Sequence, residues 1–227
     1  MMQKKMENTS YITYTIVGIN LMIFLYMLLK FGTTTSVEAL VQMGAKSNIH
    51  IVFSHEFWRL ISAAFIHIGF EHLLFNNLSI YFIGIDLEKL MGHLRFIGLF
   101  IVSSLGGNLF SFAFNSNVSA GASTGIFGLF ISYVVLARMY PKFLVLKQRA
   151  TSFSILIILN IVTGVMGSGV DNWGHIGGAV FGGLITLLIG LDKRYSSRIN
   201  WKIRLASLLT LILLSLLLLY LGFQRVL

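Results

Sequence analysis

Long apolar runs without charged residues recur along the chain. Residues 11–29, 150–170 and 205–224 carry no charge, and neither does the longer stretch 96–137. About 20 apolar residues in a helix cross a bilayer core, so the three shorter runs predict one spanning helix each and the long stretch predicts two. A polar cluster at residues 115–119 marks the turn between those two helices.

Two further spanning helices are predicted where apolar runs begin with polar residues. Glu71 and His72 stand at the start of one, and His175 near the start of the other. The pattern therefore predicts an all-α integral membrane protein in which seven helices form one domain. The expected layout is a tail at 1–10, a core at 11–191 with helices near 11–31, 70–90, 96–114, 121–139, 150–166 and 173–191, and a loop and seventh transmembrane helix within 192–227.

The positive charges favour an orientation with the N-terminus inside. Cytoplasmic loops of membrane proteins carry an excess of Lys and Arg. With the N-terminus inside, 13 of the 17 Lys and Arg residues fall on inner segments and four on the outer side. The outer four are Lys30, Lys46, Arg59 and Arg225. The short tail and the loop after residue 191 are then cytoplasmic.

Composition agrees with a membrane protein and excludes several other classes. The chain is 56% hydrophobic and 11% charged, with a mean hydropathy of +0.83. The absence of cysteine excludes disulfides and a thiol nucleophile. The net charge is +9, but the Lys and Arg residues lie between apolar runs rather than in one patch, which argues against nucleic acid and favours a role in membrane topology. The expected partner of the apolar helices is the lipid bilayer. The first ten residues are too polar for a cleaved signal peptide, so the first apolar run is expected to remain as an anchor.

The longest predicted connection, residues 31–69, lies on the outer side in this topology. It combines few charges with Phe53, Phe57, Trp58 and other apolar residues. That mixture predicts a segment partly embedded in the membrane interface rather than a free loop.

Ser123 is a candidate nucleophile at the start of a predicted helix. Gly121 and Gly125 allow a sharp turn and a close approach of neighbouring backbone. The N-terminus of a helix offers unpaired N–H groups and a positive dipole end, which can stabilise a developing oxyanion. A simpler interpretation remains open, in which Ser123 is only an N-cap and the glycines are packing contacts.

His175 is an ionisable residue within a predicted span, and such residues usually face an interior cavity and a partner. His175, Gly178 and Gly182 share one helix face by their spacing, and Gly121, Gly125, Gly128 and Ser132 form a similar face on the helix of Ser123. Two small-residue faces can pack closely, which would bring His175 within reach of Ser123 as its base. The alternative is a buried histidine that bonds a backbone carbonyl.

His72 and Asn76 lie one turn apart and can both donate hydrogen bonds to a developing oxyanion. They could instead only hold helices together. No metal site is expected, because the sequence lacks a His-Glu-x-x-His motif and Glu71 points away from the His72 face. Asp171 is assigned no role behind the imidazole, and His67, off the His72 face, is expected to act within its loop.

Taken together, these segments resemble the rhomboid family of intramembrane serine proteases over residues 58 to 185. The resemblance rests on Trp58-Arg59, His67, His72-Leu73-Leu74-Phe75-Asn76, Gly121-Ala122-Ser123 and Gly174-His175-Ile176-Gly177-Gly178.

The resemblance implies a role for each matched residue. Ser123 would be the nucleophile and His175 its general base, in a dyad without an acid. His72, Asn76 and the Ser123 N–H would form the oxyanion hole, and Phe127 would stack on the histidine. It also implies the rhomboid fold, a six-helix core plus the seventh helix, and no cofactor. The family usually has glycine after the serine, so the effect of Thr124 on the substrate side is left open.

The expected function is hydrolysis of peptide bonds in or near the transmembrane segments of membrane proteins. The expected location is a bacterial plasma membrane, with the active site toward the outer face. The alternative is a non-catalytic rhomboid relative that binds membrane clients, although such proteins typically lack the serine or the histidine. A transporter would show paired intramembrane carboxylates or two repeat halves, and neither is visible in the sequence. The substrate, its cut site and the oligomeric state are not predicted.

Overall fold

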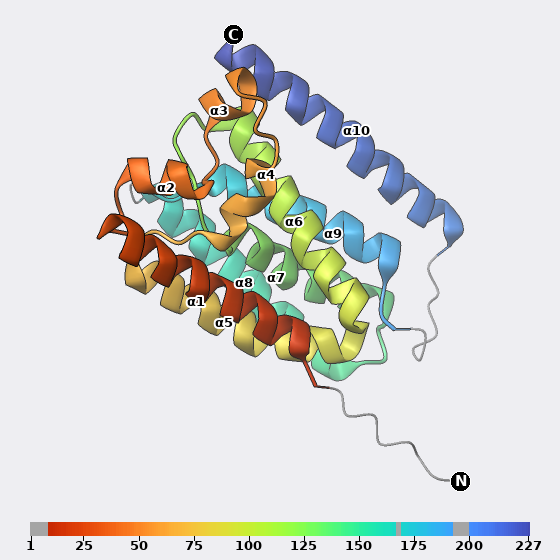
Figure 1. Ribbon diagram of the computed structural model, residues 1–227. Helices are drawn as coiled ribbons and strands as arrows, with labels where there is room; N and C mark the ends of the chain where they lie inside the picture. The colour runs from red at the N-terminus through yellow and green to blue at the C-terminus, as the bar shows by residue number, and fades with distance from the viewer. Residues whose placement is uncertain (1–8, 167–168, 193–199) are drawn as a thin grey trace.

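The described part of the chain, residues 9–166, 169–192 and 200–227 of a computed structural model, consists of helices joined by loops, with one isolated β-bridge (Figure 1). The long helices are α1 (Tyr11–Phe31), α5 (Gly69–Met91), α6 (His93–Phe114), α7 (Ser123–Met139), α8 (Leu144–Met166), α9 (Asn172–Ile189) and α10 (Trp201–Val226). Four short helices follow α1: α2 (Val37–Met43), α3 (Asn48–Phe53), α4 (Arg59–Ser62) and the 3₁₀-helix η1 (Ala63–Phe65). The all-α membrane fold predicted from the apolar runs is confirmed, and the N-terminus-inside orientation stays a prediction.

Five of these helices are long and apolar enough to cross a membrane: α1, α6, residues 144–162 of α8, α9 and α10. α7 is apolar but shorter, at 17 residues. α5 has 23 residues and carries charges at both ends, with Glu71 in the first turn and Lys89 in the last. Apolar side chains on the outside of several helices are exposed, as expected where lipid rather than water surrounds the protein. The chain is therefore a multi-pass membrane protein.

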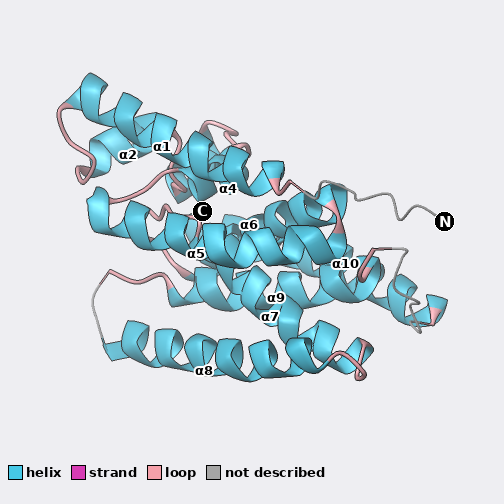
Figure 2. Cartoon of the chain, turned by 90° about the horizontal axis from the view of Figure 1, so that it is seen from below, coloured by secondary structure: helices cyan, strands magenta, loops and turns pink. Residues whose placement is uncertain are grey.

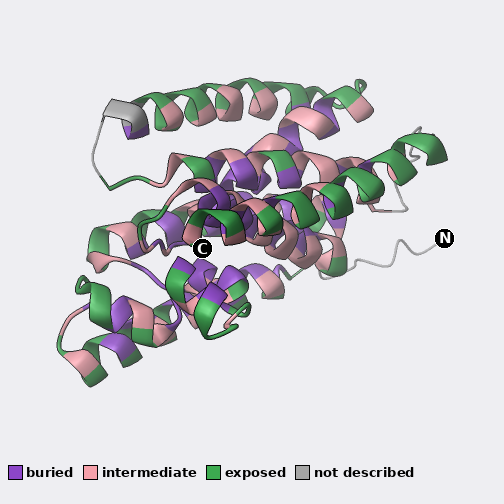
Figure 3. Ribbon diagram, turned by 90° about the horizontal axis from the view of Figure 1, so that it is seen from above, coloured by how far each residue is buried: buried purple, intermediate pink, exposed green. Residues whose placement is uncertain are grey.

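The helices α6, α7 and α9 form the centre of the bundle. α1 and α5 pack together on one side, α8 packs against α7 on the other, and α10 lies along α6 and α9 (Figures 1 and 2). In Figure 3 the purple buried residues gather on the central helices, while α8 is largely exposed or intermediate. The centre, where packing defines positions most closely, is thus made of the two helices that begin with the candidate dyad and their neighbour α6.

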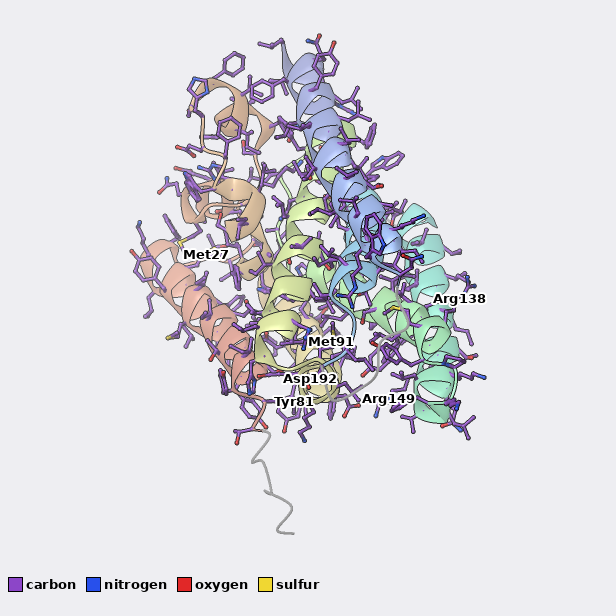
Figure 4. All side chains as sticks on the ribbon, turned by 90° about the vertical axis from the view of Figure 1, so that its right-hand side faces the viewer. Met27, Tyr81, Met91, Arg138, Arg149 and Asp192 are labelled. Atoms are coloured by element: carbon purple, nitrogen blue, oxygen red, sulfur yellow. The ribbon has the colours of Figure 1, made fainter. Side chains whose placement is uncertain are left out.

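Charged pairs gather at the end of the bundle opposite the short helices. Figure 4 shows Met91, Asp192 and Arg149 toward this end and Met27 toward the other. Arg149 of α8 pairs with Asp86 of α5, and Arg95 lies 3.5 Å from Asp192. α8 begins at Leu144 rather than near residue 150. A helix can continue through charged residues when their long side chains reach polar partners, as Arg149 reaches Asp86.

The connection between α1 and α5 folds against the opposite end of the bundle. Ile51 and Val52 are buried in the main core, whereas Phe53, Phe57 and Trp58 are exposed. The Arg59 guanidinium holds the turns of this segment by donating to the carbonyl oxygens of Val41 and Ala45 at 2.6 and 3.0 Å. The exposed aromatic residues suit the predicted interfacial location, which stays a prediction.

Candidate active site

Ser123 and His175 meet at the N-terminal ends of two central helices. Ser123 is the first residue of α7, and His175 lies in the first turn of α9. The His175 Nε2 atom lies 3.0 Å from the Ser123 Oγ atom, a hydrogen-bond distance. His175 is buried, with 8% of its surface exposed. This geometry allows the imidazole to take a proton from the hydroxyl group.

The two helices approach closely because glycines of α9 face the backbone of α7. A Cβ at Gly178 would overlap the Thr124 carbonyl oxygen, and a Cβ at Gly182 would overlap Gly128 Cα. The face predicted for α7 was wrong in part, since only Gly128 of its glycines meets α9. Gly125 packs on Phe100 and Ser104 of α6 instead. The physical reason is that α7 lies between α6 and α9 and must offer small residues to both.

Gly121 lies before α7 and not on its face. Its φ of 136° is in the region that favours glycine, and a Cβ there would come within 2.5 Å of the His72 ring. Gly121 therefore allows the turn before Ser123 to pass directly over His72.

The imidazole of His175 is held by an aromatic ring rather than by a carboxylate. The Phe127 ring is stacked on it with ring centroids 4.1 Å apart and planes 10° from parallel. Within the described residues the His175 Nδ1 atom has no hydrogen-bond partner. The Asp171 carboxylate instead accepts from the Gly174 N–H at 3.1 Å and from the Ser111 hydroxyl group. Asp171 is thus the N-cap of α9.

His72 and Asn76 on α5 line the same cavity as the Ser–His pair. The cavity has a volume of about 910 Å³. The Asn76 amide donates to the His72 carbonyl oxygen at 2.7 Å, and the His72 Nδ1 atom accepts from the Ile68 N–H at 3.4 Å. An Nδ1 that accepts implies that the proton of a neutral ring is on Nε2. The His72 ring can therefore donate a hydrogen bond from Nε2.

His67 supports the turn before Ser123. It is buried, and its Nε2 atom accepts from the Ala122 N–H at 3.4 Å. Burial, with a smaller effect of nearby His72, lowers the pKa of His67 to about 3. The ring is thus neutral near pH 7 and can act as an acceptor. His67 holds the residue before Ser123 rather than the reacting group.

Thr124 occupies a slot between α6 and α9. Its side chain is buried, and a Cβ at Gly107 or Gly174 would collide with it or touch it. Small residues on the neighbours thus make room for a β-branched side chain directly after Ser123. Sequence reasoning missed this slot, because Gly107 is far from Thr124 in the chain and its spacing has no special pattern.

The cavity walls come from α5, α7, α8, α9 and the segment before α7. Besides the polar residues, the lining includes Phe75, Ile126, Phe130, Leu156 and Trp173. Such a cavity can accept an extended peptide with apolar side chains. In the part of the chain that the structure describes, no group of three or more His, Asp or Glu side chains could hold a metal ion.

Comparisons with known proteins identify the family of this chain. A family model of the Rhomboid domain matches residues 54–192. The chain is 35% identical over 182 residues to the rhomboid protease GluP of Bacillus subtilis (strain 168), covering 80% of this chain and 36% of that relative. It is 29% identical over 230 residues to the rhomboid protease AarA of Providencia stuartii, covering 89% of this chain and 81% of that relative. RHOMBOID-like protein 4 of Arabidopsis thaliana is 32% identical over 157 residues, covering 67% of this chain and 39% of that relative. The chain spans 36 to 40% of the length of the first three curated relatives it matches.

Proposed function

Because the chain belongs to the rhomboid family of intramembrane proteases, we propose that it is a serine endopeptidase in which Ser123 is the nucleophile and His175 the general base. The observation that carries the proposal is the 3.0 Å distance between His175 Nε2 and Ser123 Oγ. Two polar side chains from separate helices converge on one cavity there, which is the nucleophile–base arrangement of acyl transfer.

The first half of the reaction forms an acyl-enzyme. Ser123 Oγ attacks the carbonyl carbon of the substrate as His175 Nε2 takes the hydroxyl proton. The carbonyl oxygen becomes negative, and the side chains of His72 and Asn76 with the Ser123 N–H donate to it. The protonated His175 then gives its proton to the leaving amine as the peptide bond breaks.

The second half releases the acyl group by hydrolysis. Water attacks the ester carbon while His175 takes one of its protons, and the ester bond to Ser123 Oγ breaks as His175 returns the proton to the serine. Throughout, the Phe127 ring keeps the imidazole in its plane by stacking on it. Among the described residues no hydrogen-bond partner is found for His175 Nδ1, which supports a dyad.

We further propose that the substrates are membrane proteins cut where a transmembrane helix is unwound. A helical peptide bond is hydrogen-bonded within the helix and shielded from attack, so an extended segment must enter the cavity. The 13 to 4 distribution of Lys and Arg supports a site near the outer face, with residues 11–191 as the protease core and α10 as a seventh span. A bacterial plasma membrane is the proposed location.

The test is cleavage of a model transmembrane substrate by the purified protein in detergent or liposomes. Ser123→Ala and His175→Ala should each abolish turnover, and the double variant should lose hardly more, because the two residues act as a unit. Thermal melts should show that all three variants stay folded. Substantial cleavage by either single variant would overturn the dyad, and an inactive wild type would favour a client-binding protein instead.

A further inference from the structure

Lys46, in the turn between α2 and α3, is a charged residue inside the outer end of the protein. Its exposed fraction is 0%. Its ammonium group donates three hydrogen bonds: to Asn48 Oδ1 at 3.0 Å, to the Asn115 carbonyl at 2.9 Å and to the Asn117 carbonyl at 2.7 Å. An ammonium group has three donors, so every one is used. A buried charge is costly unless it is satisfied in this way.

Two of the three acceptors, the Asn115 and Asn117 carbonyls, belong to the segment that leads to Ser123. Residues 115–119 run from the end of α6, and the Lys46 backbone adds two more bonds, pairing with Ser119 at 2.9 and 3.1 Å in an antiparallel bridge. The same segment lines the cavity together with Ser123. A shift of this segment would therefore move both a wall of the cavity and the start of α7.

A chain of side-chain hydrogen bonds continues from this segment to α9. The Ser119 hydroxyl group lies 3.1 Å from that of Ser111, and Ser111 donates to the Asp171 carboxylate. Asp171 in turn caps α9 through the Gly174 N–H, and its carbonyl oxygen accepts from the His175 N–H at 3.1 Å. The contacts of Lys46 thus connect, bond by bond, to the turn that carries His175.

We propose that Lys46 is a positioning residue of the active site, which holds residues 115–119 and, through Ser111 and Asp171, the first turn of α9 where Ser123 and His175 can meet. The proposal rests on the proposed protease function. It explains why a lysine is buried here at all, since an apolar residue would fill the space without the desolvation of a charge. Lys46 touches no reacting atom and acts only through these contacts.

Titration of Lys46 gives the proposal a signature of its own. Burial lowers the pKa of Lys46 from 10.5 to about 8, with Asp171 of α9 raising it and Arg225 of α10 lowering it by smaller amounts. Above this pKa the amine has two donors for three acceptors, so one of its three bonds, two of which hold residues 115–117, is lost. In the unfolded chain the pKa of this group is near 10.5. Between about pH 8 and pH 10.5 the unfolded state therefore binds more protons than the folded state, and the contribution of Lys46 to the free energy of unfolding rises with pH. Turnover should fall over this pH range, although the contribution of Lys46 to stability does not fall.

The experiment compares wild type, Lys46→Met and Lys30→Met with the model substrate at matched folded concentration. Lys30 is an exposed lysine at the end of α1, so Lys30→Met removes the same charge from the same side of the protein. A displacement of catalytic groups by about 1 Å lowers rates by about a hundredfold, so we expect Lys46→Met to lose 10- to 100-fold in turnover and Lys30→Met to stay within about twofold. Labelling of Ser123 by a fluorophosphonate should slow in Lys46→Met in parallel.

The pH profile separates positioning from stability. Wild-type turnover should fall above pH 8 toward the level of Lys46→Met, and the variant should show no such fall; thermal melts at each pH give the folded fraction. If Lys46→Met turns over substrate and is labelled as fast as the wild type, the proposal is wrong and the dyad is unaffected. If Lys46→Met does not fold, the pH profile of the wild type alone is the test. Constant turnover per folded wild-type molecule from pH 7 to about 9.5 overturns the proposal. An inactive wild type would instead contradict the proposed function.

Discussion

The two faces of α7 are packed in different ways. Toward α9 the contact is backbone to backbone, with Gly178 against the Thr124 carbonyl and Gly182 against Gly128. Toward α8 the contact is made by rings, with Phe153 stacked 5.2 Å from Phe130. α8 is also more exposed than α9, as Figure 3 shows.

The two interfaces should therefore differ in how well they tolerate substitutions. A backbone contact cannot relax around an added atom, whereas a ring can be replaced by another apolar side chain at modest cost. The Ser123–His175 pair lies across the rigid interface, and α8 contributes only to the cavity wall. We expect activity to depend steeply on the α7–α9 interface and weakly on the α7–α8 interface.

Among changes that leave the dyad residues in place, the largest effect is expected from one methyl group in the α7–α9 interface. Gly178→Ala places a Cβ on the Thr124 carbonyl, so α9 must shift and carry His175 away from Ser123. We expect a loss of turnover of about a hundredfold or more, together with a lower melting temperature. Turnover and thermal melts of the purified variant measure both.

Gly183→Ala is the matched control on the same helix. A Cβ there has ordinary contacts, with Ile131 and Val135 at 3.9 Å. Since alanine favours the helix over glycine by about 0.8–1.0 kcal/mol, this variant should be as active as wild type and no less stable. Similar losses in the two alanine variants would show that the interface is not the sensitive element.

α5 lies outside this interface, but two of its residues, His72 and Asn76, are expected to take part in the chemistry. If Asn76 donates to the oxyanion, Asn76→Ala should lower kcat by about a hundredfold at nearly constant KM, because the charge exists only in the transition state. His72→Ala should act in the same direction. Kinetics at matched folded concentration measure both changes.

Asn77→Ala provides the comparison, since Asn77 is adjacent, equally buried and bonded to Asn20 of α1 at 2.8 Å. It should lower stability and leave the kcat of the folded fraction close to that of wild type. If Asn76→Ala behaves like Asn77→Ala, Asn76 returns to a purely structural role.

Much of the fold could be predicted because a bilayer restricts the chain to long apolar helices. The runs at 11–29 and 205–224 lie within α1 and α10 of the structure. The short helices α2 to α4 could not be predicted in this way, because they pack on one end of the bundle through single residues such as Ile51 rather than through a periodic face.

The convergence of Ser123 and His175 was predictable from glycine spacing, but the details of their surroundings were not. Spacing along α7 does not say which neighbour each small residue meets, so Gly125 was assigned to the wrong interface. The bond between Ser111 and Asp171 joins residues 60 positions apart, and each is a common polar residue when seen alone. Such pairings depend on tertiary packing, which a single sequence does not encode in a local pattern.

The smallest effects are expected from replacing one phenylalanine by leucine at each of the two interfaces of α7. Phe127 stacks on His175 at 4.1 Å, and Phe153 of α8 stacks on Phe130 at 5.2 Å. Phe→Leu removes a ring and keeps an apolar side chain in both places, and each change should cost about 1–2 kcal/mol of stability. In Phe127→Leu the imidazole loses the surface that fixes its plane, so turnover should fall by up to about tenfold. In Phe153→Leu the dyad keeps all its contacts, and turnover per folded molecule should stay within about twofold of wild type. Equal losses of turnover would mean that α8 positions the dyad as strongly as α9 does, and the contrast between the two faces of α7 would then be wrong.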